Sequence, residues 1–326
     1  MENMSFQNSD LSTMKDHIDE SLEDLVLQKM SDIEAPAMKL AKDILLAGGK
    51  RFRPILALLA FDAAGGKDQD MIMDLALASE IIHTATLVHD DIYDQSKTRR
   101  GMPTLHVSHG ISHAIIAGDY LFVLGFGLGG KYDNIVVEKM AKTCANIASG
   151  ELLQFEHIGN LSTTPEDYYS IVDGKTAGPF ATACSCAGII AGSSAAIIES
   201  LDNFGIELGR AFQLVDDLLD LTGEPSMGKP KGTDVHDGKM TLPIIHALTI
   251  LHGVEREQLA DILNNFSNDR WQELTELLVK SGSLEYTKQL IINHVDRALK
   301  HLDSLPDTNA KSMMCEIAIA SQTRKS

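Results

Sequence analysis

Six aspartates form two clusters that repeat one spacing, with members at positions i, i+1 and i+4. The clusters are Asp90, Asp91 and Asp94 in LVHDDIYD, and Asp216, Asp217 and Asp220 in QLVDDLLD. On a helix the first and last members share a face, and adjacent like charges repel unless something neutralises them. Two such clusters facing each other would offer the carboxylate oxygens that Mg²⁺ prefers, with water and substrate phosphates completing its octahedron.

The second cluster strengthens this interpretation. One aspartate cluster is weak evidence, because the same spacing occurs on many solvated surfaces. The second, however, lies among leucines and a valine in 213–221, where a solvated face is a poor description. Calcium binding and plain surface acids are the lesser alternatives, and an EF-hand is excluded because the sequence has no D-x-D-x-D-G loop.

Basic residues gather beside the same motifs, although the chain carries a net charge of −18. They are Lys50, Arg51 and Arg53 in GGKRFRP, Arg99 and Arg100 after the first cluster, Lys175 in GKTAG, and Lys229, Lys231 and Lys239 after the second cluster. Arginine and lysine in such groups favour binding of phosphate oxygens. Separate acidic and basic groups predict a site for two diphosphates, one held through metal and one held directly by cations.

The elements that position these residues are predicted to be helices. Apolar residues recur at spacings of three and four over 69–91, 134–158, 166–190, 194–222 and 238–252, and then over shorter amphipathic segments within 255–303. Thr164 followed by Pro165 gives a helix start, with a capping hydroxyl and a proline in the first turn.

No alternation typical of strands is sustained along the chain, so we predict an all-α fold built as a bundle of many helices. Residues 1–326 are expected to form a single domain. Its motif-bearing core spans about 40–245, and its C-terminal helices span about 255–320.

The segment GFGLGG (125–130) matches the dinucleotide-binding pattern G-x-G-x-x-G. That site needs a preceding strand and a βαβ unit, and the rest of the chain offers neither. We prefer the interpretation that Gly125, Gly127 and Gly129 let helices pack closely or leave room for a ligand.

Composition excludes several other classes of function. A net charge of −18 argues against general nucleic-acid binding, because no basic field is present to displace phosphate counterions. The four cysteines form no C-x-x-C pair and indicate reduced thiols in a cytoplasmic protein. The N-terminus lacks the regions of a signal peptide, and no uninterrupted apolar run approaches the roughly 18 residues of a membrane span.

Together these motifs resemble the trans-polyprenyl diphosphate synthases. The segments GGKRFRP, HTATLVHDDIYDQSKTRRGMPT, GDYLF, Lys175-Thr176, QLVDDLLDLTGE and GKPKGTDVHDGKMTLP occur in the order of that family. The resemblance implies an isoprenoid-synthase helical bundle with a central active-site cavity, usually a homodimer. It also implies an Mg²⁺-dependent prenyltransferase that joins isopentenyl diphosphate head-to-tail to an allylic diphosphate.

The resemblance assigns roles to single residues. Asp90, Asp94, Asp216 and Asp220 would hold Mg²⁺, three ions when substrate is bound, with Asp91 and Asp217 in support. Lys50, Arg53, His83 and Arg100 match positions that hold isopentenyl diphosphate. Arg99, Lys175, Thr176, Gln213, Lys229 and Lys239 match positions that contact the allylic substrate, and Lys175, Thr176 and Gln213 are the candidate catalytic residues. The loop before Asp234 has one more residue than in some relatives, which leaves Lys229 and Lys231 as alternatives.

Product length is expected to depend on the residues below the first aspartate cluster. Thr86 and Ala85, four and five residues before Asp90, are small and lie about one turn deeper, at about 1.5 Å per residue. Ile81 and Ile82 belong to the next turn. We predict a product of roughly C20–C35, and a shorter product for Ala85→Phe.

Two alternatives stay open. A class I terpene cyclase shares the all-α fold but usually has a mixed Asn/Ser/Glu set as its second motif, which disfavours it. The chain could instead be the catalytic subunit of a heteromeric synthase. Isopentenyl diphosphate and an allylic prenyl diphosphate are the expected partners, with no nucleic acid and no transmembrane segment. A transient membrane contact during product release also stays open.

Overall fold

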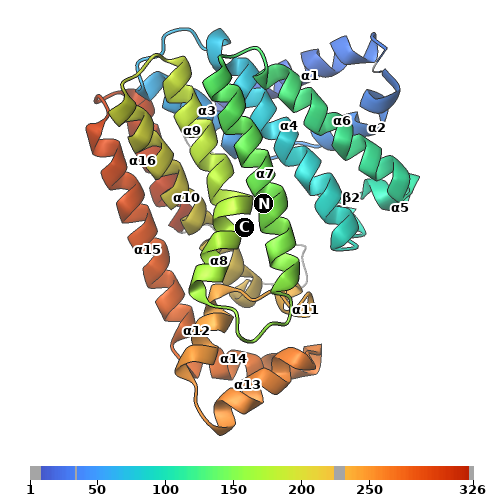
Figure 1. The fold of residues 1–326 in the computed structure, drawn as a ribbon, viewed down its shortest axis with the longest axis vertical. Coiled ribbons are helices and arrows are strands. Elements are labelled where there is room, and N and C mark those ends of the chain that lie inside the picture. The colour runs from blue at the N-terminus through green and yellow to red at the C-terminus, as the bar shows by residue number, and fades with distance from the viewer. Residues whose placement is uncertain (1–8, 34, 224–231, 323–326) are drawn as a thin grey trace.

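The computed structural model describes residues 9–33, 35–223 and 232–322, and within these ranges the chain is almost entirely helical (Figure 1). The elements up to the second aspartate cluster are α1 (Ser9–Met30), α2 (Ala35–Leu45), α3 (Phe52–Ala63), α4 (Asp70–Tyr93), the short strands β1 (Thr98–Arg99) and β2 (Met102–Pro103), α5 (Leu105–His109), α6 (Ile111–Gly129), α7 (Asn134–Glu156), α8 (Pro165–Val172), the π-helical turn η1 (Asp173–Ala177), α9 (Gly178–Ile190) and α10 (Ala195–Thr222). The predicted all-α class is confirmed, since β1 and β2 form the single sheet within the described residues.

The C-terminal part continues as short helices and ends on two longer ones. These elements are α11 (Thr233–His236), α12 (Leu242–Ile250), α13 (Val254–Asn264), the 3₁₀ turn η3 (Asn268–Arg270), α14 (Trp271–Lys280), α15 (Ser283–His301), the 3₁₀ turn η4 (Leu302–Ser304) and α16 (Asn309–Gln322).

Local signals place the start of one predicted helix well. Thr164 caps α8 through two hydrogen bonds. Its hydroxyl accepts one from the backbone N–H of Asp167, and the Asp167 carboxylate accepts one from the backbone N–H of Thr164. Pro165 follows in the first turn. The helix predicted over 166–190 is interrupted, however, because η1 separates α8 from α9. The helix predicted over 238–252 begins later, at Leu242, because Thr241 before it is in an extended conformation.

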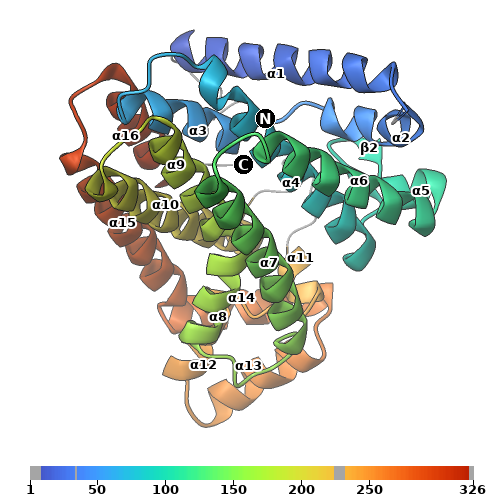
Figure 2. The same cartoon turned by 45° about the horizontal axis from the view of Figure 1, so that its top comes forward.

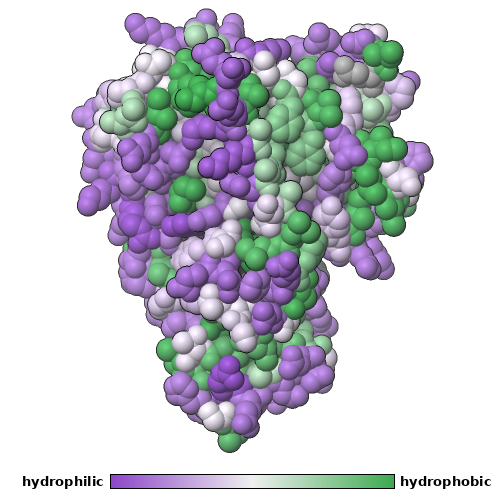
Figure 3. All heavy atoms as spheres, viewed as in Figure 1, coloured by the Kyte–Doolittle hydropathy of each residue, from purple (hydrophilic) through white to green (hydrophobic). Residues whose placement is uncertain are grey.

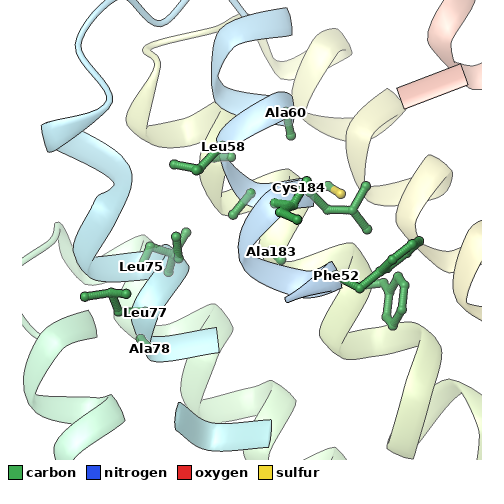
Figure 4. Close-up of a cluster of buried hydrophobic side chains, with 14 of the residues drawn as sticks. Phe52, Leu58, Ala60, Leu75, Leu77, Ala78, Ala183 and Cys184 are labelled. Atoms are coloured by element: carbon green, nitrogen blue, oxygen red, sulfur yellow. The ribbon is translucent and has the colours of Figure 1, made fainter. Parts of the chain in front are cut away.

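The long helices pack in a layered bundle around the two aspartate clusters. Helix α4 lies against α3 and α6, α3 lies against α9, and α10 packs between α9 and α15 (Figures 1 and 2). The largest buried cluster fills this bundle, and Figure 4 shows the part where α3, α4 and α9 meet. A second cluster joins α8 to α12 and α14, and α10 and α15 contribute to both clusters.

Two helices are long and apolar enough to cross a membrane by length and composition alone. They are α4, of whose most apolar window 61% is buried, and α6, with 39% buried. Helix α4 carries aspartates at its C-terminal end and packs inside the bundle, so it is a core helix. Helix α6 packs one face on α4 and leaves the other exposed.

Candidate active site

The first aspartate cluster ends helix α4, and its members point in different directions. Asp91 is 2% exposed and accepts a 2.8 Å hydrogen bond from Nε of Arg99. Asp94 forms the C-cap of α4 and stays partly exposed. Burial raises the pKa of Asp90 to about 7, and the negative charges of Glu151 and Asp94 add to this effect. Asp90 and Asp94 therefore share a site from which Asp91 is turned away.

In the second cluster Asp217 is occupied by partners within the protein. Its carboxylate is buried, and it accepts hydrogen bonds from the Tyr168 hydroxyl at 2.6 Å and from Nε2 of Gln213 at 2.9 Å. Burial raises the pKa of Asp217 to about 7, with a further contribution from Asp234. Asp217 is thus placed to orient Gln213.

Asp220 fixes the segment that follows the second cluster. Its two carboxylate oxygens accept the backbone amides of Thr233 at 3.0 Å and Asp234 at 3.1 Å, at the start of α11. Burial, together with the charge of Asp234, raises the pKa of Asp220 to about 6. Asp216 lies half-buried on α10, one turn before Asp220.

Lys239 connects Asp94 of the first cluster to Asp234, in the segment that Asp220 holds. Its Nζ lies 3.6 Å from Oδ1 of Asp94 and 3.4 Å from Oδ1 of Asp234, and Asp237 lies at 3.2 Å. Burial opposes its charge, but these three carboxylates raise the pKa of Lys239 above its ordinary value. Asp94 of the first cluster is therefore connected through Lys239 to the segment that Asp220 anchors. We call Asp90, Asp94, Asp216 and Asp220 the acidic lobe.

Lys175 is held by two residues that the sequence motifs did not single out. Nζ of Lys175 lies 2.5 Å from Oε2 of Glu151 and donates a 2.7 Å hydrogen bond to Oε1 of Gln154, both on α7. Glu151 also acts on Asp90, so it belongs to the same charge cluster. The signal for both residues is the segment GELLQ, which places two polar side chains three residues apart on one face of a helix.

Thr176 and Gln213 form a relay with Asp217. The Thr176 hydroxyl donates a 3.0 Å hydrogen bond to Oε1 of Gln213, whose amide nitrogen is committed to Asp217. The orientation of the Gln213 amide is therefore set from both ends.

The turn η1, which carries the Lys-Thr pair, is clamped on two sides. Arg210 binds the Asp173 carboxylate through two nitrogens, at 2.7 and 2.6 Å. A Cβ on Gly209 of α10 would lie 2.5 Å from Cα of Ala177, so only glycine permits this approach. The turn is thus held rigidly against α10.

Arg53, His83 and Arg100 lie near one another, and together with Lys50, which precedes Arg51 in the chain, we call them the basic lobe. Burial lowers the pKa of His83 well below its ordinary value, and the charges of Arg53 and Arg100 add to this effect. Burial also lowers the pKa of Arg53 to about 10. Arg100 donates a hydrogen bond to the carbonyl of Gly48, which places it against the GGKRFRP loop. Cations crowded in this way favour an anionic ligand.

Arg51, predicted within the same basic group, turns into the protein instead. It is 2% exposed, adopts the left-handed conformation (φ 47°), and lies 2.7 Å from both Asp19 of α1 and Glu80 of α4. Arg51 therefore fixes the loop between Lys50 and Arg53 to two helices.

An apolar cavity opens beside the basic lobe, with about 550 Å³ between its walls when the part open to solvent is included. We call it the tunnel cavity. Its wall consists of Arg53, Leu75, Ser79, Ile82, His83, Thr86, Met140, Thr143, Cys144, Ile147, Lys175, Pro179, Thr182 and Ala183. Of the four residues expected to set its depth, Thr86 and Ile82 line it. Ala85 and Ile81 are fully buried in the core and are not part of its wall.

The donor set of the acidic lobe suits a hard divalent cation. Its side-chain ligands are carboxylates, and burial, together with neighbouring negative charge, raises the pKa of Asp90 and of Asp220, an effect that a cation would oppose. Within the described residues, no three His, Cys, Asp or Glu side chains converge closely enough to enclose a metal by themselves. Mg²⁺ usually keeps waters and binds through substrate phosphates, so this openness fits it. Lys229 and Lys231 lie outside the described residues.

Known proteins resemble the chain over nearly its full length. The family model described as Polyprenyl synthetase matches residues 35–278. A short chain isoprenyl diphosphate synthase from Methanothermobacter thermautotrophicus is 36% identical over 92% of this chain and 94% of its own length. The octaprenyl diphosphate synthase of Escherichia coli is 34% identical, over 92% and 97%. The crystal structure of a polyprenyl synthase from Caulobacter crescentus with calcium and isoprenyl diphosphate superimposes with a TM-score of 0.88 at 32% identity, over 97% of both chains.

Proposed function

Because the chain belongs to the polyprenyl synthetase family, and is a prenyltransferase that elongates trans-prenyl diphosphates, we propose that it joins isopentenyl diphosphate to an allylic diphosphate whose tail fills the tunnel cavity. The observation that carries this proposal is the meeting of an acidic lobe, a basic lobe and a deep apolar cavity at one place. A terpene cyclase is not favoured.

The two lobes would take different diphosphates. Mg²⁺, on which the family depends, would bind through the acidic lobe, with three ions as the proposed number, and supplies positive charge to the allylic diphosphate. Lys175 and Lys239 lie beside carboxylates of the acidic lobe and would contact that diphosphate, and Arg99, which is bound to Asp91, would contact it as well. The basic lobe would hold isopentenyl diphosphate directly through Lys50, Arg53, His83 and Arg100. Asp91 and Asp217 would act in support, since their carboxylates are committed to Arg99, Tyr168 and Gln213.

The chain's residues would then assist ionisation, condensation and elimination. The allylic C–O bond breaks as the diphosphate departs, and cations fixed in advance stabilise its growing charge. The double bond of isopentenyl diphosphate attacks the allylic cation, which Thr176 Oγ1 and Gln213 Oε1 could stabilise. The departed diphosphate would take the final proton, so the protein needs no carboxylate as base.

We propose a product of roughly C20–C35, and the lower end of this range is supported by the depth of the tunnel cavity. On α4 its wall extends from Thr86 to Leu75. At about 1.5 Å per residue, Leu75 lies about 22 Å from Asp90 along the helix. The hydroxyl groups of the wall are satisfied locally: Thr182 is hydrogen-bonded to Thr143, which in turn donates to a backbone carbonyl. The wall therefore presents mainly apolar surface to a growing chain.

We further propose that a second copy covers α6 and α7 in a homodimer. Exposed apolar side chains gather on these helices, as Figure 3 shows on the face turned to the viewer. They include Ile111, Ile115, Ile116 and Val123 on α6, and Ile135, Leu152 and Phe155 on α7. In sedimentation experiments, Val123→Glu should yield monomers. Val279→Glu, at an equally exposed position on α14, should leave the dimer intact.

Two properties complete the proposal. The described residues would form one domain, which is supported by the contribution of α10 and α15 to both buried clusters. A cytoplasmic location is supported by four free cysteines.

The direct test of the activity uses purified protein, Mg²⁺, labelled isopentenyl diphosphate and allylic starters of several lengths. We expect elongation that stops when the metal is chelated and that is lost in Asp216→Ala. Absence of elongation with every starter would reject the autonomous enzyme and leave a subunit of a heteromeric synthase.

A further inference from the structure

The three glycines of GFGLGG occupy different environments on α6. Gly125 and Gly129 are buried and lie one helical turn apart, whereas Gly127 between them is exposed. A Cβ built on Gly127 meets no heavy atom within 4 Å. The two buried positions, in contrast, lie directly behind side chains that line the tunnel cavity.

Gly125 makes room for Ile82. A Cβ on Gly125 would lie 2.6 Å from Cγ1 and 3.2 Å from Cδ1 of Ile82, well inside the usual contact distance of about 3.5–4.0 Å. Ile82 lines the tunnel cavity from α4. Part of its side chain therefore occupies the space that a methyl group at Gly125 would fill.

Gly129 makes room for Met140 in the same way. A Cβ on Gly129 would lie 2.4 Å from both Sδ and Cε of Met140, which lines the cavity from α7. The end of the methionine side chain thus rests in a hollow on α6 and is drawn away from the cavity.

We propose that Gly125 and Gly129 set the usable depth of the tunnel cavity from outside it. They leave space on α6 into which Ile82 and Met140 pack, away from the product chain. This inference rests on the proposed function and deepens it: two positions with no place in the cavity wall become determinants of product length. A methyl group at either glycine would displace the side chain in front of it. Protein interiors are close-packed, so the displaced atoms move toward the adjacent open space, which is the cavity.

The two positions act at different depths. Ile82 lies eight residues before Asp90 on α4, or about 12 Å deeper. Met140 lies fourteen residues from Gln154 on α7, or about 21 Å from the residue that holds Lys175. Closing the hollow at Gly125 therefore blocks the cavity midway, and closing the one at Gly129 blocks it near its floor.

The side chains also differ in how easily they yield. Isoleucine is stiff at χ1 on a helix because it is branched at Cβ, so Gly125→Ala also strains the contact between α4 and α6. Methionine is unbranched and adapts readily, so Gly129→Ala moves Met140 with little strain. Gly129→Ala is therefore the variant that tests the inference if Gly125→Ala folds poorly.

The decisive experiment compares the products of Gly125→Ala, Gly129→Ala and Gly127→Ala by chromatography. Gly127→Ala is the matched control, because it makes the same substitution in the same helix with the same gain in helix propensity. We expect a loss of at least one isoprene unit in Gly129→Ala, a larger loss in Gly125→Ala, and the wild-type distribution in Gly127→Ala. Adding Met140→Ala to Gly129→Ala should restore the wild-type length or exceed it.

The inference is overturned if folded Gly129→Ala and Gly125→Ala keep the wild-type distribution, or if Gly127→Ala shortens the product equally. A binding experiment separates this outcome from failure of the proposed function. Unreactive alkyl diphosphates of rising chain length should bind about fourfold more tightly per added methylene until the cavity is full. That plateau should come at a shorter chain in Gly125→Ala and Gly129→Ala than in wild type. The plateau decides the inference even if wild type elongates no starter, a result that would reject the proposed function alone.

Discussion

Tyr168 donates a 2.6 Å hydrogen bond to Asp217, whose carboxylate is buried within the second aspartate cluster. The other carboxylate oxygen accepts the amide of Gln213, and this leaves Oε1 of Gln213 facing Thr176. Asp217, a member of the aspartate motif, is thus placed to orient Gln213 toward Thr176.

Tyr168→Phe is expected to disturb this relay. It leaves a buried carboxylate without one donor, which should lower the free energy of unfolding by about 1–3 kcal/mol. It should also lower kcat more than it raises KM, because Asp217, which orients the Gln213 amide, then has one donor fewer to fix its own position. The neighbouring Tyr169→Phe is the control, since it loses a hydrogen bond to His294 away from the relay. Wild-type kcat in folded Tyr168→Phe would contradict the relay.

Stability without metal should fall as pH rises from about 6.5 through 7, and level off above the raised pKa values. The pKa values of Asp90 and Asp217 are raised to about 7, whereas aspartate in the unfolded chain titrates near 3.9. Between these values the native state binds more protons than the unfolded state, so the free energy of unfolding decreases as pH rises. The lowered pKa of His83 acts oppositely, but its effect is complete near the unfolded histidine pKa of about 6.5.

Thermal unfolding measured against pH, with a chelator and then with Mg²⁺, checks this expectation. Mg²⁺ should reduce the decrease in the unfolding temperature with rising pH, because it binds the ionised carboxylates of the native state. Asp90→Asn should flatten it without metal, because one of the two titrating groups is removed. An unchanged slope in that variant would show that other groups control the pH dependence.

Thr86→Phe should shorten the product, because Thr86 lines the tunnel cavity one turn below Asp90. Ala85→Phe, expected from sequence to do the same, places a large ring at a fully buried position outside that wall. Overpacking there should cost about 1–3 kcal/mol of stability. Product analysis and thermal unfolding of both variants distinguish the two effects. A shorter product from a fully stable Ala85→Phe would restore the simpler model.

Glu80→Gln should weaken binding of isopentenyl diphosphate, although Glu80 is not one of the residues proposed to contact this substrate. Glu80 and Arg51 form a buried ion pair that fixes the loop between Lys50 and Arg53. Breaking such a pair typically lowers the free energy of unfolding by about 3–5 kcal/mol. We expect a loss near the lower end of this range, because Arg51 keeps its contact with Asp19. KM for isopentenyl diphosphate should rise while kcat is largely kept. A rise in KM for the allylic substrate alone would contradict this.

The fold class could be predicted because helical periodicity is a local property of the sequence, and the two aspartate clusters could be recognised from their repeated spacing. The partner that holds Asp217 could not be predicted, since Tyr168 lies 49 residues away in the sequence. Arg51 shows the same limit: its position in GGKRFRP says nothing of Glu80, which takes it into the core.

The wall of the tunnel cavity lies between these cases. On α4 it consists of Thr86, His83, Ile82, Ser79 and Leu75, which descend from Asp90 in steps that follow the helical repeat. Counting in threes and fours from Asp90 would have found them. Counting every residue of the turn below brought in Ala85 and Ile81, which lie on another face.

Helix α6 has an inner face with hollows for Ile82 and Met140 and an outer face with exposed isoleucines. A helix is stiff, so a displacement of its outer face also displaces its inner face. If copies of the chain associate through α6, the contact would hold the hollows for Ile82 and Met140 at a fixed distance from the growing chain. Product length in one subunit would then depend on contact with the other, and the product distribution would depend on protein concentration.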